Sequence, residues 1–388
     1  MKKGWQTKTL DQISANLDSR RVPITKGVRA VGEYPYYGAS GIVDYVADYI
    51  FDEDTLLISE DGANLLARST PIAFPASGKY WVNNHAHILK FESLITQRFV
   101  ELYLESIPLD DYITGAAQPK LNQKALNSIP IPVPPFPEQQ RIVGILDEAF
   151  EGLACAKANA EKNLHNARAL FENHLQSVFT QRGKGWVEKR LDQVCSFSSG
   201  GTPSKSKRSY WSGEIPWVSG RDMKSTQLSD SLLHISRSAV DESSTRMAPA
   251  GTLLILVRGM GLAHGAQIAE LMIPCAFNQD IRAIHPEPDL IPRYLLFALR
   301  DRINSSDNVL SNAAHGTLKI DSDELKSVMI PVPSRGHQQR VVTTIDSLSE
   351  ETQRLESIYQ HKLAALDELK KSLLHRAFNG ELIKDNGQ

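Results

Sequence analysis

The most regular hydrophobic pattern in the chain is a stripe that repeats every 11 residues. Apolar residues recur in steps of 3, 4 and 4 positions at Ile142, Ile145, Ala149, Leu153, Ala156, Ala160, Leu164, Ala167, Phe171, Leu175 and Val178. An 11-residue period is close to the natural pitch of the α-helix, so the pattern predicts one long and nearly straight helix. About 40 residues at 1.5 Å per residue would extend roughly 60 Å.

A second stripe follows 199 positions later in the sequence. Its positions are Val341, Thr344, Leu348, Thr352, Leu355, Tyr359, Leu363, Leu366, Lys370, Leu374 and Ala377, of which eight are apolar. A long helix with a single apolar stripe cannot stand alone in water, so we expect the two stripes to bury each other. The residues predicted to pair the helices are Ile142, Ile145, Leu153, Leu164, Phe171, Leu175, Val341, Leu348, Leu355, Leu363, Leu366 and Leu374.

The two stripes belong to a larger internal repeat. Gly4-Trp5 recurs as Gly185-Trp186, and the run Ile131–Pro134 recurs as Ile330–Pro333. The matching blocks keep their order while the offset between them grows from 181 to 199 residues. Two copies of one fold with loops of different length would produce this pattern.

Each copy divides into a mixed α/β part and a helical part. Short β-rich runs such as Thr55–Ser59 are broken by Gly, Asn and Pro turns. The alternating prolines Pro130, Pro132 and Pro134 then predict a stiff, extended connector in which no helix can form. We therefore expect an α+β protein, with two similar globular α/β domains separated by two long helices that pack as an antiparallel coiled coil about an internal pseudo-twofold axis. The predicted boundaries are 1–130 and 185–327 for the domains, and 131–184 and 328–388 for the connectors with their helices.

Composition and charge limit the class of protein without identifying it. The 388 residues, 41% hydrophobic and 23% charged, are typical of a globular protein of two or three domains. A net charge of −2 excludes a histone-like protein, although a local basic face can be hidden in a neutral total. Cys155, Cys195 and Cys275 form no CxxC pair, and no apolar segment of a signal peptide follows the first lysines. We therefore expect a cytoplasmic protein.

Several motifs resemble those of the specificity (S) subunits of type I restriction–modification enzymes. The first copy carries Pro35–Asp44 (PYYGASGIVD), Leu57–Asn64 (LISEDGAN), Trp81–His87 (WVNNHAH) and Ile129–Val143 (IPIPVPPFPEQQRIV). The resemblance covers nearly the whole chain. The second copy departs from it in the loops, with Asn278-Gln-Asp280 where the first copy has Asn83-Asn-His85. The two halves are therefore expected to read different sequences.

The resemblance implies two target-recognition domains, each of which reads one half of a split, asymmetric site on double-stranded DNA. It further implies that the long helices set the gap between the half-sites and dock two methyltransferase subunits. S-adenosylmethionine, Mg²⁺ and ATP would be bound only by the methyltransferase and restriction subunits. This chain is accordingly expected to bind no cofactor or metal and to catalyse nothing.

A DNA reader needs cations for phosphates and amide or hydroxyl groups for base edges, and both domains offer them in predicted loops. The candidates in the first domain are Arg20, Arg21, Lys26, Arg29, Tyr37, Ser40, Arg68, Lys79, Asn83, Asn84 and His85. Those in the second domain are Lys205, Lys207, Arg208, Ser219, Arg221, Arg258, Asn278 and Gln279. A solvated surface charge remains the alternative for each single cation.

A polar triplet marks the start of both predicted helices, as Gln139-Gln140-Arg141 and as Gln338-Gln339-Arg340. Its repetition at the junction of connector and helix favours a shared role. Either the triplet caps the connector or it contacts a partner subunit, and the sequence leaves both interpretations open.

Enzymatic alternatives find little support in the sequence. Gly259–Gly265 follows an apolar run as a dinucleotide-binding loop would, but the first copy has Asp61–Asn64 there, so we expect a variable loop. His85 and His87 lack a third metal ligand nearby. The remaining alternative is a bipartite DNA-binding scaffold or regulator that acts without methyltransferase partners.

Overall fold

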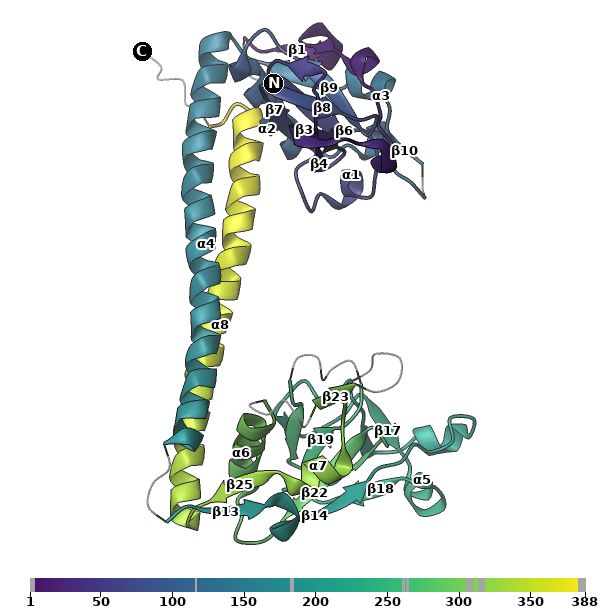
Figure 1. The fold of residues 1–388 in the computed structure, drawn as a ribbon, viewed down its shortest axis with the longest axis vertical. Helices are drawn as coiled ribbons and strands as arrows, with labels where there is room; N and C mark the ends of the chain where they lie inside the picture. Colours follow the sequence, from purple (N-terminus) through teal and green to yellow (C-terminus); the bar gives the residue numbers. More distant parts are fainter. Residues whose placement is uncertain are drawn as a thin grey trace. The chain divides into compact units, whose positions relative to one another are not determined.

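The computed structural model describes residues 4–115, 117–181, 185–259, 262, 265–304, 310–312 and 318–382. The chain divides into two compact units, residues 1–162 with 359–388 and residues 163–358. Each unit combines one globular domain with parts of both long helices (Figure 1). The first unit is therefore assembled from the two ends of the chain.

Short strands make up most of the first domain. They are β1 (Gln6–Thr9), β2 (Ala15–Asn16), β3 (Val31–Gly38), β4 (Gly41–Val46), β5 (Phe51–Asp52), β6 (Thr55–Ser59), β7 (Ala73–Ala76), β8 (Lys79–Val82), β9 (Ala86–Lys90), β10 (Ile113–Thr114), β11 (Lys120–Leu121) and β12 (Pro130–Val133). The helices are α1 (Asn64–Ala67), α2 (Leu94–Ser106), α3 (Gln123–Asn127) and the long α4 (Phe136–Thr180). Two four-stranded sheets have the orders β2-β9-β6-β7 and β4-β3-β8-β5.

The second domain repeats this plan. Its strands are β13 (Val187–Arg190), β14 (Cys195–Ser199), β15 (Ile215–Val218), β16 (Gln227–Leu228), β17 (Leu233–Ile235), β18 (Arg246–Ala248), β19 (Leu253–Leu256), β20 (Ile268–Leu271), β21 (Cys275–Phe277), β22 (Ile281–Pro286), β23 (Leu310–Asn312), β24 (Leu318–Ile320) and β25 (Met329–Val332). The helices are α5 (Arg237–Glu242), α6 (Pro292–Asn304), α7 (Ser322–Ser327) and the long α8 (Arg335–Phe378). The sheets have the orders β14-β22-β19-β20-β16 and β17-β15-β21-β18.

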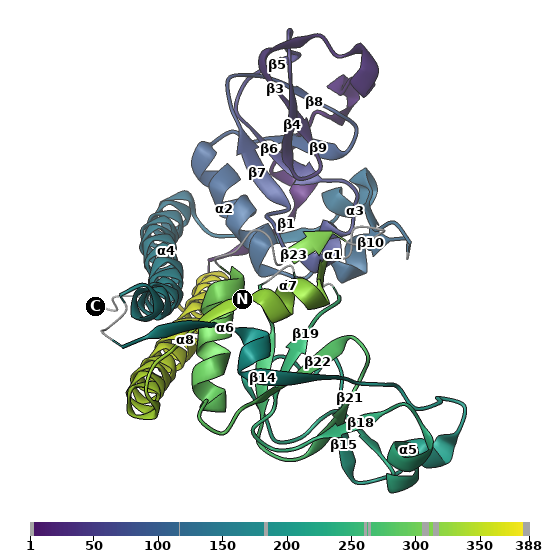
Figure 2. The ribbon, with the colours of Figure 1, turned by 60° about the horizontal axis from the view of Figure 1, so that its bottom comes forward.

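Matching strands hold matching places in the two domains. The apolar strands β6 and β19, buried along their whole length, lie inside their sheets, as a continuous apolar run predicts. Helix α2 packs against β6 and β7, and helix α6 packs against β20 and β25. Helix α6 lies between the strands of its domain and the long helices (Figure 2). The predicted similarity of the two domains is confirmed.

The proline-rich connectors form strands, which the proline pattern did not predict. β12 pairs antiparallel with β1, and β25 pairs in the same way with β13. Pro130 and Pro132 occupy alternate positions of a strand that is paired along one edge, which is the place where a missing N–H group is tolerated. Each connector thus ties the start of its domain to the start of a long helix.

Both predicted long helices are confirmed, with 45 residues in α4 and 44 in α8. In the first unit, Lys157 of α4 pairs with Asp367 of α8 at 3.0 Å. In the second unit, Arg168 pairs with Glu356 at 3.0 Å. As the residue number rises along α4 from 157 to 168, the number of its partner on α8 falls from 367 to 356. The helices therefore pack antiparallel, as expected.

The 11-residue stripe of α4 is the buried side of that helix. Every exposed position between residues 151 and 168 lies off the stripe, and Ala160 on the stripe is fully buried. On α8, Leu355 departs from the prediction, since 37% of this residue is exposed. The next residue of α8 that faces α4 after the buried Thr352 lies four positions later, not three. This residue is Glu356, which pairs with Arg168.

The ends of the long helices join the domain cores. Ile142, Leu146 and Leu374 belong to the core of the first domain, and Leu175 and Ile345 to that of the second. Phe378, near the end of α8, contacts Phe99 of α2 with ring centroids 5.2 Å apart. In the described ranges, no helix has the length and apolar character needed to cross a membrane.

Candidate nucleic-acid interface

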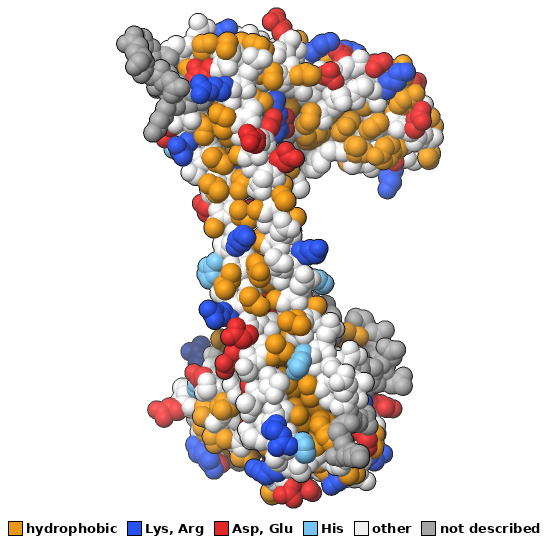
Figure 3. Space-filling view, turned by 90° about the vertical axis from the view of Figure 1, so that its left-hand side faces the viewer, with side chains coloured by type: hydrophobic (Ala, Val, Ile, Leu, Met, Phe, Trp, Pro, Cys, Tyr) orange, Lys and Arg blue, Asp and Glu red, His pale blue; other side chains and the backbone are white. Residues whose placement is uncertain are grey.

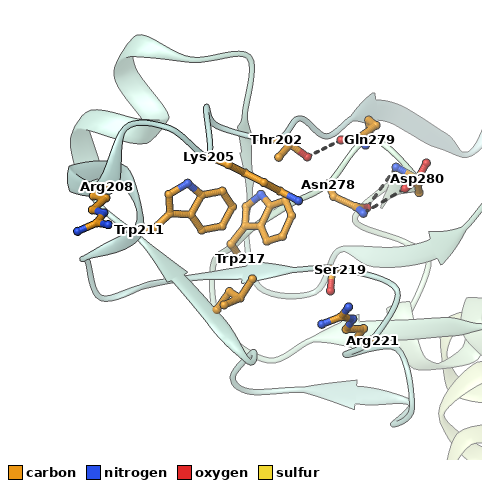
Figure 4. Close-up of a pocket in the computed structure, with 11 residues that line it drawn as sticks. Thr202, Lys205, Arg208, Trp211, Trp217, Ser219, Arg221, Asn278, Gln279 and Asp280 are labelled. Carbon is orange, nitrogen blue, oxygen red and sulfur yellow. Dashed lines mark hydrogen bonds between the residues drawn. The ribbon is translucent and has the colours of Figure 1, made fainter.

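A concavity of about 910 Å³ in the second domain brings together six of the eight DNA contacts predicted there. These are Lys205, Arg208, Ser219, Arg221, Asn278 and Gln279. They come from segments up to 74 positions apart in the sequence. Figure 4 shows Arg208 at one end of the concavity and the turn Asn278–Asp280 at the other.

The sheet explains why these segments meet. β15 and β21 are parallel neighbours, so their carboxyl ends lie at the same edge. Ser219 and Arg221 follow β15, and the turn Asn278–Asp280 follows β21. Loops at this edge of a sheet are free to carry binding groups, because the strands below hold them in place.

Two glycines allow the loop with Lys205 to approach this edge. A Cβ atom on Gly200 would lie 2.3 Å from the carbonyl oxygens of Phe277 and Asn278. A Cβ atom on Gly201 would lie 2.5 Å from the carbonyl oxygen of Ser244. A side chain at position 200 would therefore push the loop away from the end of β21, and one at position 201 would push it away from Ser244.

The indoles of Trp211 and Trp217 form one wall of the concavity, beside Lys205 (Figure 4). Their ring centroids are 5.1 Å apart in an edge-to-face arrangement. Each Nε1–H already donates to a backbone carbonyl, that of Ser204 at 3.1 Å and that of Gly201 at 3.0 Å. The rings thus offer the concavity only apolar surface, and the buried Trp217 is mainly a core residue.

The cations of the concavity have no ion-pair partner in the part of the chain that the structure describes. Lys205, Arg208 and Arg221 are exposed, and no carboxylate among the described residues lies within ion-pair distance of them. Lys207 differs, because its Nζ lies 2.7 Å from Glu242 and 3.0 Å from the hydroxyl of Tyr210. These two hydrogen bonds raise the pKa of Lys207. It does not line the concavity.

A second concavity, of about 350 Å³, adjoins the first. It is lined by Arg258, Arg282 and Lys319, and it shares Gln279 and Asp280 with the first. Arg282 donates to the hydroxyls of Ser199 and Ser322. Sequence reasoning found Arg258 but not Arg282 or Lys319, because no local motif marks them and Lys319 reaches Arg258 through a long-range β-bridge.

In the first domain, Arg20 and Arg21 have internal partners. Arg20 pairs with Glu53 at 2.5 Å, and its guanidinium lies 4.5 Å from the ring centroid of Phe51. Arg21 pairs with Glu60 at 2.5 Å and donates to the carbonyl of Ala86 at 3.0 Å. Burial alone would raise the pKa of Glu60, but the hydrogen bonds from Arg21 and Lys120 and the nearby His87 outweigh it, so the pKa is lowered.

The other predicted cations of this domain fall into two groups, arginines with partners inside the domain and exposed lysines. Arg29 pairs with Asp44 at 3.0 Å, and its hydrogen bond lowers the pKa of that carboxyl. Arg68 has the left-handed φ of 50° and donates to the carbonyls of Leu104 and Ile107 at the end of α2. Lys26 and Lys79 are exposed, and Lys79 lies 4.7 Å from the ring centroid of Tyr49. The arginines therefore stabilise the fold, while the two lysines face solvent.

The remaining candidates cluster where β3 and β8 end. Ser40 and Asn84 are exposed, and the Nδ1 of the exposed His85 lies 2.8 Å from the carboxylate of Asp61. Asn83 is buried, and Tyr37 stacks on Phe74 with centroids 6.1 Å apart. On the face drawn in Figure 3, basic and acidic side chains are interspersed, without a single basic patch.

His87 is a core residue. It is 1% exposed, and its ring nitrogens lie 2.6 Å from the Asp18 carboxylate and 2.7 Å from the carbonyl of Leu121. Among the described residues, no group of three His, Cys, Asp or Glu side chains could hold a metal ion. Of the glycine-rich stretch 259–265, residues 260, 261, 263 and 264 lie outside the described residues.

The first glutamine of each polar triplet closes its connector. Gln139 donates to the carbonyl of Pro134 at 2.9 Å and accepts from the hydroxyl of Thr96 at 2.9 Å. Gln338 donates to the carbonyl of Pro333 at 3.0 Å and accepts from the N–H of Ile291 at 2.8 Å. The remaining members of the triplets are exposed: Gln140, Arg141, Gln339 and Arg340. They stay predicted contacts for a partner.

Comparison with known proteins matches both copies to one family. The profile described as "Type I restriction modification DNA specificity domain" matches residues 2–162 and 183–361. The specificity subunit of the Escherichia coli type I restriction enzyme EcoR124I/EcoR124II is 31% identical over 256 residues, 64% of this chain and 62% of that protein. A putative type I specificity subunit of Haemophilus influenzae, S.HindORF215P, is 37% identical over 140 residues, 36% of either chain.

The fold is also found in solved structures. A chain from a study of complex assembly and conformational transition in a type I R-M system gives a TM-score of 0.77 at 18% identity, covering 98% of this chain and 99% of that one. The HsdS subunit from Thermoanaerobacter tengcongensis gives 0.58 at 17% identity, covering 98% of both. At this identity the likeness concerns the fold. The two curated relatives above are matched over less than two thirds of their own length, 62% and 36%.

Proposed function

Because the chain belongs to the family of type I restriction–modification DNA specificity domains, we propose that it is the DNA-specificity subunit of a type I restriction–modification complex. Each domain reads one half of a bipartite, asymmetric site on double-stranded DNA. The duplicated fold supports two readers, and the different loops of the two copies support two different half-sites.

The observation that carries this proposal is the unpaired cationic concavity of the second domain. Lys205, Arg208 and Arg221 line it without carboxylate partners among the described residues, and the exposed Gln279 lines the same concavity. Exposed cations that the fold does not neutralise are available to phosphates, and an exposed amide in the same concavity is available to base edges. A purely structural role would not require three unpaired cations at one edge of a sheet.

The finer parts of the proposal concern the partners and the chemistry. Two methyltransferase subunits dock on α4 and α8, the helices set the gap between the half-sites, and restriction subunits complete the assembly. S-adenosylmethionine, Mg²⁺ and ATP belong to those subunits, so this chain binds no cofactor, performs no catalysis and acts in the cytoplasm. The boundaries 1–130, 131–184, 185–327 and 328–388 belong to the same proposal. The exposed triplet residues at both helix starts are available for such docking.

The alternative is a bipartite DNA-binding scaffold or regulator without methyltransferase partners. It shares the DNA-binding surface and differs only in what the helices bind. Purification of the full chain from its own cell distinguishes the two, because the proposed function predicts a stable complex with two methyltransferase subunits.

The test of DNA recognition begins with the site itself. Sequencing of methylated adenines in a cell that contains the chain and its methyltransferase should reveal one bipartite motif. Binding of the purified complex to a duplex with that motif is then measured over a range of salt concentrations. We expect Lys205→Ala, Arg208→Ala and Arg221→Ala together to weaken binding and to reduce the salt slope by about 0.9 per lost phosphate contact.

Lys207→Ala is the matched control, since this neighbouring lysine is paired with Glu242 outside the concavity. It should leave both the affinity and the salt slope close to those of the wild type. A genome without a bipartite methylated motif, or a triple variant with the wild-type salt slope, would contradict the proposal.

A further inference from the structure

The same three-residue turn occurs in both domains at the end of the parallel strand pair. Asn83–His85 follows β8, and Asn278–Asp280 follows β21. The N–H of Asn83 donates to the carbonyl of Tyr37, and the N–H of Asn278 to that of Val218, both at 3.0 Å. The first residue of the turn is thus attached to the neighbouring parallel strand in both copies.

Two further hydrogen bonds are duplicated. The carbonyl of His85 accepts from the N–H of Glu60 at 2.9 Å, and that of Asp280 from the N–H of Val257 at 2.8 Å. The side-chain oxygen of the asparagine accepts from the N–H of the third residue, at 2.8 Å in the first domain and 3.2 Å in the second. Both asparagines are buried, with 7% and 8% exposed. They hold the turn, whose second and third side chains differ between the domains. In the second domain, the Oε1 of Gln279 accepts from the hydroxyl of Thr202 at 2.5 Å, and the Asp280 carboxylate accepts from the Nδ2 of Asn278 at 3.4 Å.

In the second domain those two side chains form a ridge between two concavities. Three cations line each of them, and Asp321 also lines the smaller one. Gln279 and Asp280 line both of them. Lys205, Arg208 and Arg221 lie on one side, and Arg258, Arg282 and Lys319 on the other. A groove of duplex DNA presents base edges between two phosphate backbones, so a polar ridge with cations on both flanks complements it.

A third position varies together with the turn. The bridges Asp61↔Lys120 and Arg258↔Lys319 show that Asp61 and Arg258 occupy equivalent places. In the first domain Asp61 lies 2.8 Å from the third turn residue, His85. In the second domain Arg258 lines the same concavity as the third turn residue, Asp280. The acidic residue thus stands at the bridge position in the first domain and at the third turn position in the second, and the basic residue stands at the other position of each pair. This exchange reverses the pattern of hydrogen-bond donors and acceptors that the two positions offer to a ligand.

We propose that Gln279, Asp280 and Arg258 read the bases of the second domain's half-site, and that Asn84, His85 and Asp61 read those of the other. This inference rests on the proposed function and names the residues that give it specificity. The Asp280 carboxylate only accepts hydrogen bonds, so it selects a base with an exocyclic amino group. The Arg258 guanidinium can donate hydrogen bonds to both acceptors of guanine, O6 and N7. Asp280 on cytosine and Arg258 on guanine would together select a C·G pair.

The test uses the full chain with its methyltransferase partners and random-sequence DNA duplexes, from which bound sequences are selected and read. We expect Asp280→Asn, which keeps shape and the backbone hydrogen bonds, to reduce the preference for one C·G pair by about 10- to 100-fold. The other half-site should not change. The double variant Arg258→Asp with Asp280→His, which installs the first domain's pair, should select a different base pair at that place alone. Thermal unfolding of each variant confirms that the fold is kept.

The outcomes separate this inference from the proposed function. Wild-type base preference in both variants, with a bipartite site still selected, would overturn the inference and leave the proposed function standing. A wild-type complex that selects no sequence would overturn both. Lys207→Ala serves again as the control, because its ammonium group is paired outside both concavities.

Discussion

The arginines predicted to contact DNA differ between the two domains in whether they have carboxylate partners. Those of the first domain, such as Arg20, Arg21 and Arg29, are paired with carboxylates, whereas Arg208 and Arg221 of the second have no carboxylate within ion-pair distance in the described ranges. A cation that already has an internal partner must lose or share it before it can bind a phosphate. In the proposed function, phosphate binding by the first domain therefore falls mainly to lysines such as Lys26 and Lys79, which are exposed.

The buried Asp18 gives a prediction for stability at the residue scale. Burial alone would raise the pKa of Asp18, but the hydrogen bond and charge of His87, the N–H of Ile88 and the charge of Arg21 outweigh it and lower the pKa. Since the folded pKa lies below the unfolded value of 3.8, the stabilisation is present above about pH 4 and is lost as the pH falls through the folded pKa. Asp18→Asn should lower the free energy of unfolding near pH 7 by about 1–3 kcal/mol.

Urea denaturation near neutral pH and near pH 3 measures this effect. The difference between the variant and the wild type should shrink at the lower pH, because the carboxyl of the unfolded chain is then largely protonated and the charge of the folded carboxyl no longer contributes its full stabilisation. Asp54→Asn is the control, since Asp54 is exposed on the same domain. An equal loss of stability at both pH values would show that packing rather than charge accounts for the role of Asp18.

At the scale of elements, the sequence predicted the long helices well and the strands only in part. The stripe of α4 could be read because helix periodicity is local, and each step depends on residues three or four positions away. The pairing of β12 with β1 joins Pro130 to Thr9, and no local pattern contains that information. Leu355 was assigned to the stripe because it lies 199 positions after Ala156, although the helix phase places Glu356 inward.

The sequence predicted which types of residue form the candidate site, but not where in the fold these residues come together. Lys205, Arg208, Asn278 and Gln279 stood out as cations and amides in loops, yet only the parallel pairing of β15 with β21 brings them together. Sequence reasoning also treated Asn278 as a base reader, whereas its oxygen accepts from the backbone of its own turn. The same hydrogen bond occurs in both domains, which shows that this asparagine holds the turn.

Gly200 gives a prediction at the same scale. Gly200→Ala places a Cβ atom 2.3 Å from two backbone oxygens, so the loop that carries Lys205 must move. We expect the free energy of unfolding to fall by about 1–3 kcal/mol and DNA binding by the second domain to weaken. Gly152→Ala in α4 is the opposite control: its Cβ atom meets nothing within 4 Å, so the change should stabilise the helix by about 0.5–1 kcal/mol. Thermal unfolding compares the two, and an unaffected Gly200→Ala variant would contradict the close approach.

On the scale of the whole molecule, the two long helices are parts of both domain cores. Each unit takes one end of α4 and the opposite end of α8, so neither domain is complete with one helix alone. In the first unit Phe378 packs on Phe99 and Tyr103, with centroids 5.2 and 5.1 Å apart. A change in helix length therefore has to be made in both helices together, or one core loses its partner.

The proposed spacing role of the helices can be tested by lengthening both of them together. Inserting two 11-residue repeats into α4 and two matching repeats into α8 adds about 33 Å of helix and about six turns, so the apolar stripes stay in phase. The added length is close to one turn of DNA, about 34–36 Å. We expect the selected sequence to keep both half-sites and to gain about ten base pairs between them.

A single repeat in each helix is the informative control. It adds about 16 Å, close to half a turn of DNA, so one domain would meet the opposite face of the duplex. We expect that variant to fold, with a helix content that rises as designed, and to bind each half-site only weakly. If both insertions leave the gap unchanged, or if they alter the bases instead of the gap, the helices do not set the spacing, and the distance between half-sites must be fixed by the docked subunits.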